Sequence, residues 1–277
     1  MAAPLTAFPS HRSSVLRQVQ NSASSKLPCS KAVLVLGNNE AGKTSLIAKM
    51  MGNEDPRKGS GLEYQHMLVR DEYRDEHTKL GFWVLDGSDD VVSQNLLTFA
   101  LNEDTFSDTT VLLTASMTAP WDLLTALQKW AKVLEQHIAT LTIPADRLRA
   151  ARTQCAKRYL DYISPGDEIE GLVSSPAKSR SDSVMETPTK DLPDGVLTHN
   201  LGLDVVVVIT KTDYMSVLEK QMDFKEEAFD FIQQAVRKFC LQYGASLFYV
   251  SAKINKNCDL LYKYLGQYAL TSHRPTT

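Results

Sequence analysis

The sequence has little that would bind a metal through cysteine, cross a membrane or attract a polyanion. Lysine and arginine number 30 against 33 acids, a formal net charge of −3, so global charge does not favour nucleic acid or an anionic membrane as a partner. Apolar runs such as Val205 to Ile209 are strand-sized, and we predict no membrane span. The four cysteines show neither metal-ligand nor disulfide spacing, which is typical of the reducing cytoplasm. They are Cys29, Cys155, Cys240 and Cys258.

The amino-terminal stretch is rich in serine and contains Arg12, Arg17 and Lys26, with no acid before Glu40. Mitochondrial transit peptides share this composition. The stretch has little amphipathic periodicity, which instead favours a basic and mostly disordered tail. We therefore predict a tail over residues 1–30 and one folded domain over residues 31–277, with an imported enzyme as the alternative.

Short apolar runs alternate with segments of helical composition along this domain. Runs that are apolar throughout suit strands buried on both faces, and their alternation with helices implies right-handed crossovers. The pattern predicts an α/β fold with a doubly wound, mostly parallel, six-stranded sheet. The expected strands are Lys31–Gly37, Tyr64–Arg70, Leu80–Asp86, Thr110–Ala115, Asp204–Thr210 and Ser246–Ser251.

Two further segments are expected to be helical and to pack against this sheet. Lys43–Met51 has helical composition and follows the first expected strand. A longer helix is predicted from Pro120 to Leu141, where leucine, isoleucine and alanine recur every three or four residues. We assign that apolar stripe to the core, and expect Trp121 and Trp130 to pack there too.

An insertion is predicted at about residues 144–200. Arg147–Ile163 has helical composition, whereas Ser164–Pro193 is rich in serine, proline and charge, which predicts a flexible loop. In that loop, Ser175 and Thr187 each precede a proline, with a lysine two residues further on. This pattern is typical of proline-directed kinase sites, although Ser-Pro pairs also occur in any disordered loop. Phosphate there would add charge that alters partner choice.

The sharpest motif is a G-x-x-x-x-G-K-[ST] phosphate loop that begins at Gly37 and ends at Thr44, between an expected strand and an expected helix. Its two glycines let the backbone curl so that amides point at phosphates, the helix adds its dipole, and Lys43 adds a point charge. Thr44 and Asp86 are the predicted ligands of a magnesium ion. The predicted nucleotide contacts of the loop are Gly37, Asn38, Asn39, Glu40, Ala41, Gly42, Lys43, Thr44 and Ser45.

Two loops that follow later strands predict which base is bound. Thr210–Asp213 follows one strand, and the triplet Ser251, Ala252 and Lys253 follows the last. Together with the phosphate loop, they resemble in order and position the guanine-reading elements of Ras-like GTPases. The resemblance implies that Asp213 accepts hydrogen bonds from guanine and that the stem of Lys211 lies over the base. Guanine nucleotide, GDP or GTP, is therefore predicted over ATP.

The elements that would support hydrolysis are poorly matched. Asp86 stands where the D-x-x-G motif of that family begins, but Asp89 replaces its glycine and Asp90 its water-orienting glutamine. Two carboxylates would repel a trianionic phosphate. Between Gly52 and Gln65 there is no threonine to complete a magnesium shell, and Ser60 is the only hydroxyl before Tyr64. We predict weak or absent hydrolysis and a nucleotide that stabilises the fold.

Several segments that nucleotide binding does not require resemble the light intermediate chain of cytoplasmic dynein rather than the ciliary form. The resemblance covers about Val15 to Tyr268 and includes Ser25 to Pro28, which argues against an import signal. Its most specific strings are SKLPCSKAVLVLGNNEAGKTSLIAK, GSGLEYQHMLV, WVLDG, LQKWAKVLEQHI, LTHNLGLDVVVVITKTD, MSVLEK, DFIQQAVRKFCLQYGASLFYVSAK and NKNCDLLYKYL.

The resemblance implies a cytoplasmic, microtubule-associated subunit whose globular domain docks on the dynein heavy chain tail. It also implies a long C-terminal extension that cargo adaptors bind. Because the sequence ends at Thr277, adaptor binding is expected of the full family member and not of these residues. A fragment, a short isoform and an incomplete gene model all fit this ending.

The sequence therefore leaves three candidate functions. The preferred one is a non-catalytic motor subunit that links heavy chain to cargo in retrograde transport. The alternatives are a regulatory Ras-like GTPase that hydrolyses GTP and an imported mitochondrial GTPase. Asp89 and Asp90 favour the first over the second.

Overall fold

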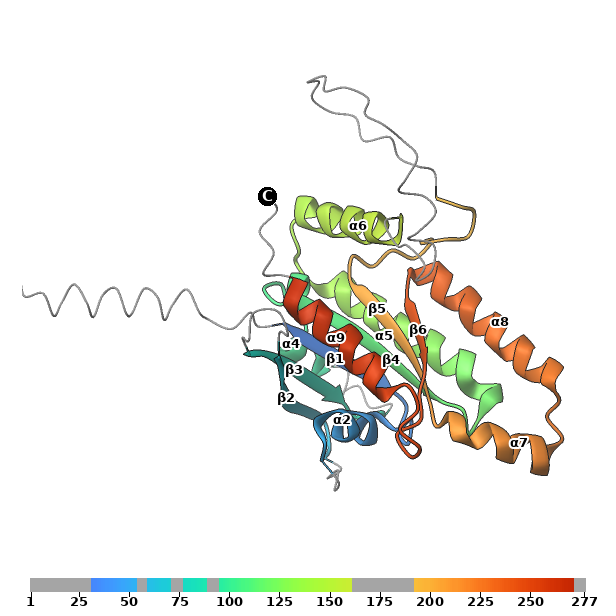
Figure 1. Ribbon diagram of the computed structural model, residues 1–277. Helices are drawn as coiled ribbons and strands as arrows, with labels where there is room; N and C mark the ends of the chain where they lie inside the picture. The colour runs from blue at the N-terminus through green and yellow to red at the C-terminus, as the bar shows by residue number, and fades with distance from the viewer. Residues whose placement is uncertain (1–30, 54–58, 71–76, 89–94, 161–191, 272–277) are drawn as a thin grey trace, which may run out of the picture.

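The computed structural model describes residues 31–53, 59–70, 77–88, 95–160 and 192–271, which form a six-stranded sheet covered by helices (Figure 1). The strand order is β2-β3-β1-β4-β5-β6, and neighbouring strands are parallel except for the antiparallel pair β2 and β3. The predicted α/β, mostly parallel architecture is therefore confirmed. The strands are β1 (Ala32–Gly37), β2 (Leu62–Arg70), β3 (His77–Leu85), β4 (Thr109–Ser116), β5 (Asp204–Thr210) and β6 (Ser246–Tyr249).

Helices lie on both faces of the sheet because the central strands are apolar on both faces. Val33 and Val35 of β1 face the side packed by α2 (Lys43–Met51) and α9 (Cys258–Thr271). Leu34 and Leu36, which alternate with them, face the opposite helices. Those helices are α4 (Leu97–Ala100), α5 (Leu123–Thr140), α7 (Met215–Met222) and α8 (Glu226–Tyr243). No helix of the described ranges is long and apolar enough to cross a membrane.

The long helix predicted from Pro120 is split in the structure. A 3-10 turn, η2 (Pro120–Asp122), precedes α5. Trp130 packs in the core as predicted and is 3% exposed, but the same prediction for Trp121 was wrong, because that side chain is 66% exposed. Trp121 belongs to the turn, so the helical periodicity that places Trp130 inward does not extend to it.

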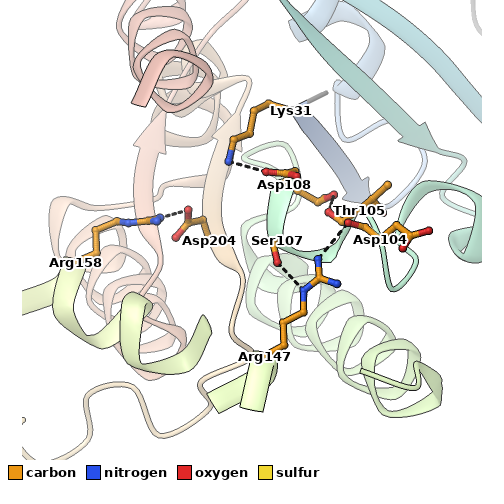
Figure 2. Close-up of polar contacts among 9 residues, drawn as sticks. Lys31, Asp104, Thr105, Ser107, Asp108, Arg147, Arg158 and Asp204 are labelled. Carbon is orange, nitrogen blue, oxygen red and sulfur yellow. Dashed lines mark hydrogen bonds and ion pairs between the residues drawn. The ribbon is translucent and has the colours of Figure 1, made fainter. Parts of the chain in front are cut away.

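Helix α6 (Ala145–Leu160) is the predicted extra helix, and it lies across the amino ends of β4 and β5 (Figure 2). Arg147 Nε donates to Ser107 Oγ over 3.1 Å, and Arg158 forms an ion pair with Asp204 at the start of β5. The apolar side of α6 contacts the backbone at Gly202, where an added Cβ would lie 3.4 Å from Ala151 Cβ. Arginine contacts at both ends thus hold the helix on the sheet.

Several predictions fall on residues outside the described ranges. These are the amino-terminal tail over residues 1–30, most of the predicted flexible loop, and the candidate phosphorylation sites Ser175 and Thr187. Asp89 and Asp90, which replace the family's hydrolytic residues, also lie outside.

Candidate functional site

The loop between β1 and α2 holds the predicted phosphate-binding residues, and its two glycines are required there for different reasons. A Cβ atom at Gly37 would lie 2.2 Å from Thr114 Oγ1 and 2.4 Å from the Thr114 carbonyl oxygen. Gly42 has a φ of 85°, a left-handed conformation that glycine adopts without strain. Gly42 is the N-cap of α2, and within the described residues no side-chain hydrogen bond caps that end. The first turn of α2 therefore presents backbone amides and a positive dipole to an anion.

Lys43 curls back over this loop. Its side chain is buried, with 7% exposed, and its Nζ donates to the carbonyl oxygens of Gly37 at 2.6 Å and Asn38 at 2.9 Å. Burying an ammonium group requires compensating hydrogen bonds or charge. The two carbonyl groups supply part of this compensation and hold the cation at the loop.

Side chains from distant elements support the loop from behind. Trp130 Nε1 of α5 donates to Asn38 Oδ1 over 2.8 Å. Thr210 Oγ1 at the end of β5 donates to the Ala41 carbonyl oxygen over 2.5 Å. Because both donors are in the well-packed interior, they hold the loop in one conformation.

The two loops predicted to read the base lie next to each other at the carboxyl ends of β5 and β6. Lys211 has a φ of 54°, and the turn it begins, η3 (Thr212–Tyr214), brings Asp213 to Ser251. Ser251 Oγ donates to Asp213 Oδ1 over 2.5 Å, and the Thr212 amide donates to the Val250 carbonyl oxygen over 3.2 Å. The buried serine thus orients the carboxylate, which is still partly exposed and keeps acceptor capacity for a ligand.

Ser251 is itself held by its neighbours. Its amide and carbonyl exchange hydrogen bonds with those of Lys256, at 3.1 and 2.9 Å. Cys258 Sγ donates to the Ser251 carbonyl oxygen over 3.5 Å. Burial, and then the nearby charge of Asp259, raise the pKa of the Cys258 thiol, so it remains a protonated donor at neutral pH.

A cavity of about 660 Å³ joins the phosphate loop to the two base-side loops. This volume is within the range of about 300–1,000 Å³ typical of small-molecule sites. The cavity is amphipathic, since lysine side chains, apolar side chains and the carboxylate of Asp213 all line it. Its lining includes Gly42, Ser45, Lys49, Thr118, Lys211, Asp213, Val250, Ala252 and Lys253.

A smaller hollow of about 190 Å³ opens on the other side of the phosphate loop. It brings together Thr44 and Asp86, the two predicted magnesium ligands, with the acids Glu40 and Glu63. The segment that follows β3 crowds this side, because a Cβ at Gly87 would lie 2.2 Å from the Asn39 nitrogen. The Gly87 amide also donates to Asn39 Oδ1 over 3.1 Å. No group of three or more acidic, histidine or cysteine side chains among the described residues could hold a metal ion.

The structure thus gathers the predicted site residues into one region, but in different roles. Residues 39–45 line the two cavities directly, as do Lys211, Asp213, Ala252 and Lys253. Gly37 and Asn38 lie at the base of the loop and accept from Lys43, and Ser251 is buried behind Asp213. Their binding of a nucleotide stays a prediction.

The sequence did not predict the residues that support the loop. Trp130, Thr210 and Gly87 were not predicted as site residues, although each contacts the phosphate loop. Trp130 and Thr210 are 92 and 169 residues from their acceptors, so no local pattern indicates the contact. Only Gly87 had a usable signal, since it directly follows the predicted metal ligand at the end of a strand.

Comparison with known proteins identifies the family. A family model described as dynein light intermediate chain matches residues 9–276. The chain is 45% identical over 261 residues to cytoplasmic dynein 1 light intermediate chain 1 of Homo sapiens, an alignment that covers 92% of this chain and 48% of that relative. It is 30% identical over 272 residues to the Dictyostelium discoideum protein of the same name, covering 84% and 53%. The chain therefore spans about half the length of the curated relatives it matches.

A solved structure has the same fold. The crystal structure of the dynein light intermediate chain's conserved domain superposes with a TM-score of 0.63 at 23% identity, and covers 91% of this chain and 78% of that one. At this identity the likeness concerns the fold alone. The family model and the sequence identities lead to one conclusion: the chain belongs to the dynein light intermediate chain family.

Proposed function

We propose that this chain is the nucleotide-binding domain of a non-catalytic cytoplasmic dynein subunit, and that it holds a guanine nucleotide as part of its folded structure. The observation that carries the proposal is the single cavity that connects the phosphate loop to Lys211, Asp213 and Lys253. The phosphate loop lines this cavity through Gly42 and Ser45, and residues 39–45 line the adjoining smaller hollow, so the base and the phosphates of one nucleotide would occupy neighbouring cavities.

The residues present fit such a ligand. The amides of the first turn of α2 and the ammonium of Lys43 would hold the phosphates. Asp213, oriented by Ser251, would accept the ring and amino hydrogens of guanine. Adenine offers no such pair of donors to one carboxylate, which supports GDP or GTP over ATP. The bound nucleotide would supply stabilisation of the folded state rather than a reaction.

The acids at the smaller hollow support retention without turnover. Glu40, Glu63 and Asp86 line the same hollow as Lys43 and Thr44, and like charges raise the energy of adding a third phosphate there. Phosphoryl transfer depends on positioned metal, water and charge, and the sequence has Asp90 in place of a water-orienting glutamine. A regulatory GTPase is therefore the weaker proposal.

The relatives support a place in the motor. Those matched are named as light intermediate chains of cytoplasmic dynein, so we assign this chain to the cytoplasmic, microtubule-associated complex. The dynein heavy chain tail is the proposed direct partner. Cargo adaptors are proposed partners of the full-length family member, through the C-terminal extension that the family resemblance implies.

Mass spectrometry of the nucleotide released from purified, denatured protein tests the ligand. We expect guanine nucleotide, and we expect added GDP to raise the melting temperature where ATP does not. Protein that is empty and unaffected by any purine nucleotide would contradict the structural-ligand proposal.

The remaining parts of the proposal have separate readouts. A multiple-turnover assay should detect little or no phosphate release from GTP, and turnover at the rate of assisted switch GTPases would favour the regulatory alternative. A pull-down with a heavy chain tail fragment tests the motor assignment, and should succeed whether or not hydrolysis occurs.

A further inference from the structure

Helix α6 concentrates positive charge at the end of the sheet away from the proposed nucleotide site. It carries five cations and one acid, Asp146, within a chain whose net charge is −3. The helix contacts the amino ends of β4 and β5, whereas the phosphate loop follows the carboxyl end of β1. The cations are Arg147, Arg149, Arg152, Lys157 and Arg158.

A hollow of about 150 Å³ lies between α6 and the strand ends. Arg147 and Arg158 both line it, together with the hydroxyl-bearing Ser107 and the amide of Gln154. Figure 2 shows both guanidinium groups reaching from the helix toward the strands. Among the described lining residues, Arg147 and Arg158 outnumber the one acid, Asp204, so this part of the hollow has excess positive charge.

The two arginines retain donors for a ligand. Arg147 donates to Ser107 Oγ and to the Asp104 carbonyl oxygen, at 3.1 and 3.3 Å, and in the described part of the chain no carboxylate pairs with it. A guanidinium has five N–H donors, so these two bonds leave capacity. Arg158 pairs with Asp204 through one nitrogen, and its side chain is still 50% exposed. Its planar guanidinium group can donate two parallel hydrogen bonds to a phosphate or a carboxylate.

The surface of α6 also restricts the type of partner. An interfacial membrane helix needs a free apolar face, but Leu148 and Ala151 of α6 are already packed around Gly202. A nucleic-acid binder that neutralises about 6–10 phosphates needs more cations than the five that this helix provides. A hollow of this size can hold one anionic group such as a phosphate. The exposed cations beside it, such as Arg149 and Arg152, can pair with the acids of a short peptide.

We infer that α6 and this hollow form a docking surface for an acidic peptide of a partner protein that carries a phosphorylated serine or threonine. The phosphoryl group occupies the hollow between the arginines and Ser107. The acidic residues beside it contact the exposed cations of α6. The surface is independent of the proposed nucleotide site, because it uses the opposite end of the sheet.

Fluorescence anisotropy of the full chain tests this surface. The protein is first treated with phosphatase, so that no phosphate on the chain itself competes. The probe is a labelled acidic peptide with a single phosphoserine, measured beside its unphosphorylated twin and beside vesicles that contain phosphatidylserine. We expect the unphosphorylated peptide to bind roughly tenfold more weakly, because it lacks the charge-assisted hydrogen bonds of the phosphate. Equal affinity for the two peptides, or preference for the vesicles, would overturn the inference.

Two variants separate a built site from a general positive field. The double variant Arg147→Lys and Arg158→Lys keeps the charge but removes both planar guanidinium groups. It should weaken phosphopeptide binding by about tenfold. Asp204→Asn removes the competing carboxylate and should strengthen it several-fold. Arg237→Gln on α8 is the control for loss of a remote exposed charge, and should change little. Unchanged binding in the double lysine variant would exclude the hollow as the phosphate site.

Hydrogen exchange of the unmodified protein gives a readout that requires no variant. Bound phosphopeptide should slow exchange of amides over α6, residues 145–160, and leave α2 unaffected. Protection over α2 instead would place the phosphoserine in the nucleotide phosphate loop and overturn the assignment to α6.

Discussion

The two cavities beside the phosphate loop differ in their volume, in their acidic lining and in the hydrogen bonds that support them. On the base side, Asp213 is oriented by Ser251, and Thr210 supports the loop from the neighbouring strand. On the other side, acids line a hollow of about 190 Å³, less than a third of the volume of the base-side cavity. There the backbone at Gly87 is packed directly against Asn39.

This difference indicates that holding a nucleotide and cleaving one depend on separate parts of the fold. In the proposed function, holding uses the loop, the amino end of α2, Lys43 and the base-side loops, and buried hydrogen bonds support the loop and orient Asp213. Cleavage requires room, metal and water beside the terminal phosphate. The acidic and crowded side therefore supports a ligand that stabilises the domain without being consumed.

The largest effect is expected from Lys43→Ala, which removes the buried cation of the phosphate loop. A ligand present at about a thousand times its dissociation constant stabilises the folded state by roughly 4 kcal/mol. We expect the variant to lose nearly all of that GDP-dependent gain in the free energy of unfolding, measured by urea denaturation with and without GDP. Lys263→Ala, an exposed lysine of α9, is the control. A full GDP-dependent gain in the variant would contradict the structural role of the nucleotide.

Asp213→Ala tests the base side alone. Each hydrogen bond to a charged group contributes about 1.5–3 kcal/mol, so losing the two bonds that Asp213 would accept should weaken GDP binding by at least about a hundredfold. Titration calorimetry measures this, with Asp259→Ala as a control for loss of an exposed acid. If the affinity for GDP stays within twofold of the unsubstituted protein, guanine is not read by this residue.

Trp130→Phe tests the support behind the loop. The substitution removes the donor to Asn38 and some buried volume, and we expect it to lower the free energy of unfolding by about 1–2 kcal/mol. The matched control is Trp121→Phe, which should change stability very little because Trp121 is mostly exposed. Equal effects of the two substitutions would mean that the bond to Asn38 contributes nothing.

The same two tryptophans show what the sequence can and cannot predict. Continuous apolar runs located the strands, and the bounds of β5 were predicted without error because it is buried on both faces. The helical stripe correctly placed Trp130 in the core. It failed for Trp121, because a stripe does not reveal where a helix gives way to a 3-10 turn.

The candidate site divides in the same way. Contiguous motifs identified the phosphate loop and the two base-side loops, whose residues the structure brings to common cavities. The hydrogen bonds from Trp130 and Thr210 could not be predicted from the sequence, because they join residues far apart along the chain. Crowding at Gly87 depends on backbone packing between two loops, which composition and spacing do not encode.

The smallest effect is expected from Asn39→Ala, which addresses the crowded side. Its side chain accepts from the Gly87 amide at an exposed position, so the bond should contribute only about 0.5–1 kcal/mol. Without that bond the backbone at Gly87 can move away from the loop, and competition between GTP and GDP should shift toward GTP by about two- to fivefold. GDP affinity itself should stay nearly constant, because the base side and the backbone amide of residue 39 are both retained.

The control for this substitution is Asn53→Ala, which alters the lining of the larger cavity instead. It should change the affinities for GDP and GTP by the same factor and leave their ratio constant. If Asn39→Ala also leaves the ratio constant, packing at Gly87 does not limit the third phosphate. The like charges of Glu40, Glu63 and Asp86 would then have to account for all discrimination on that side, which substitution of Glu63 by Gln would measure directly.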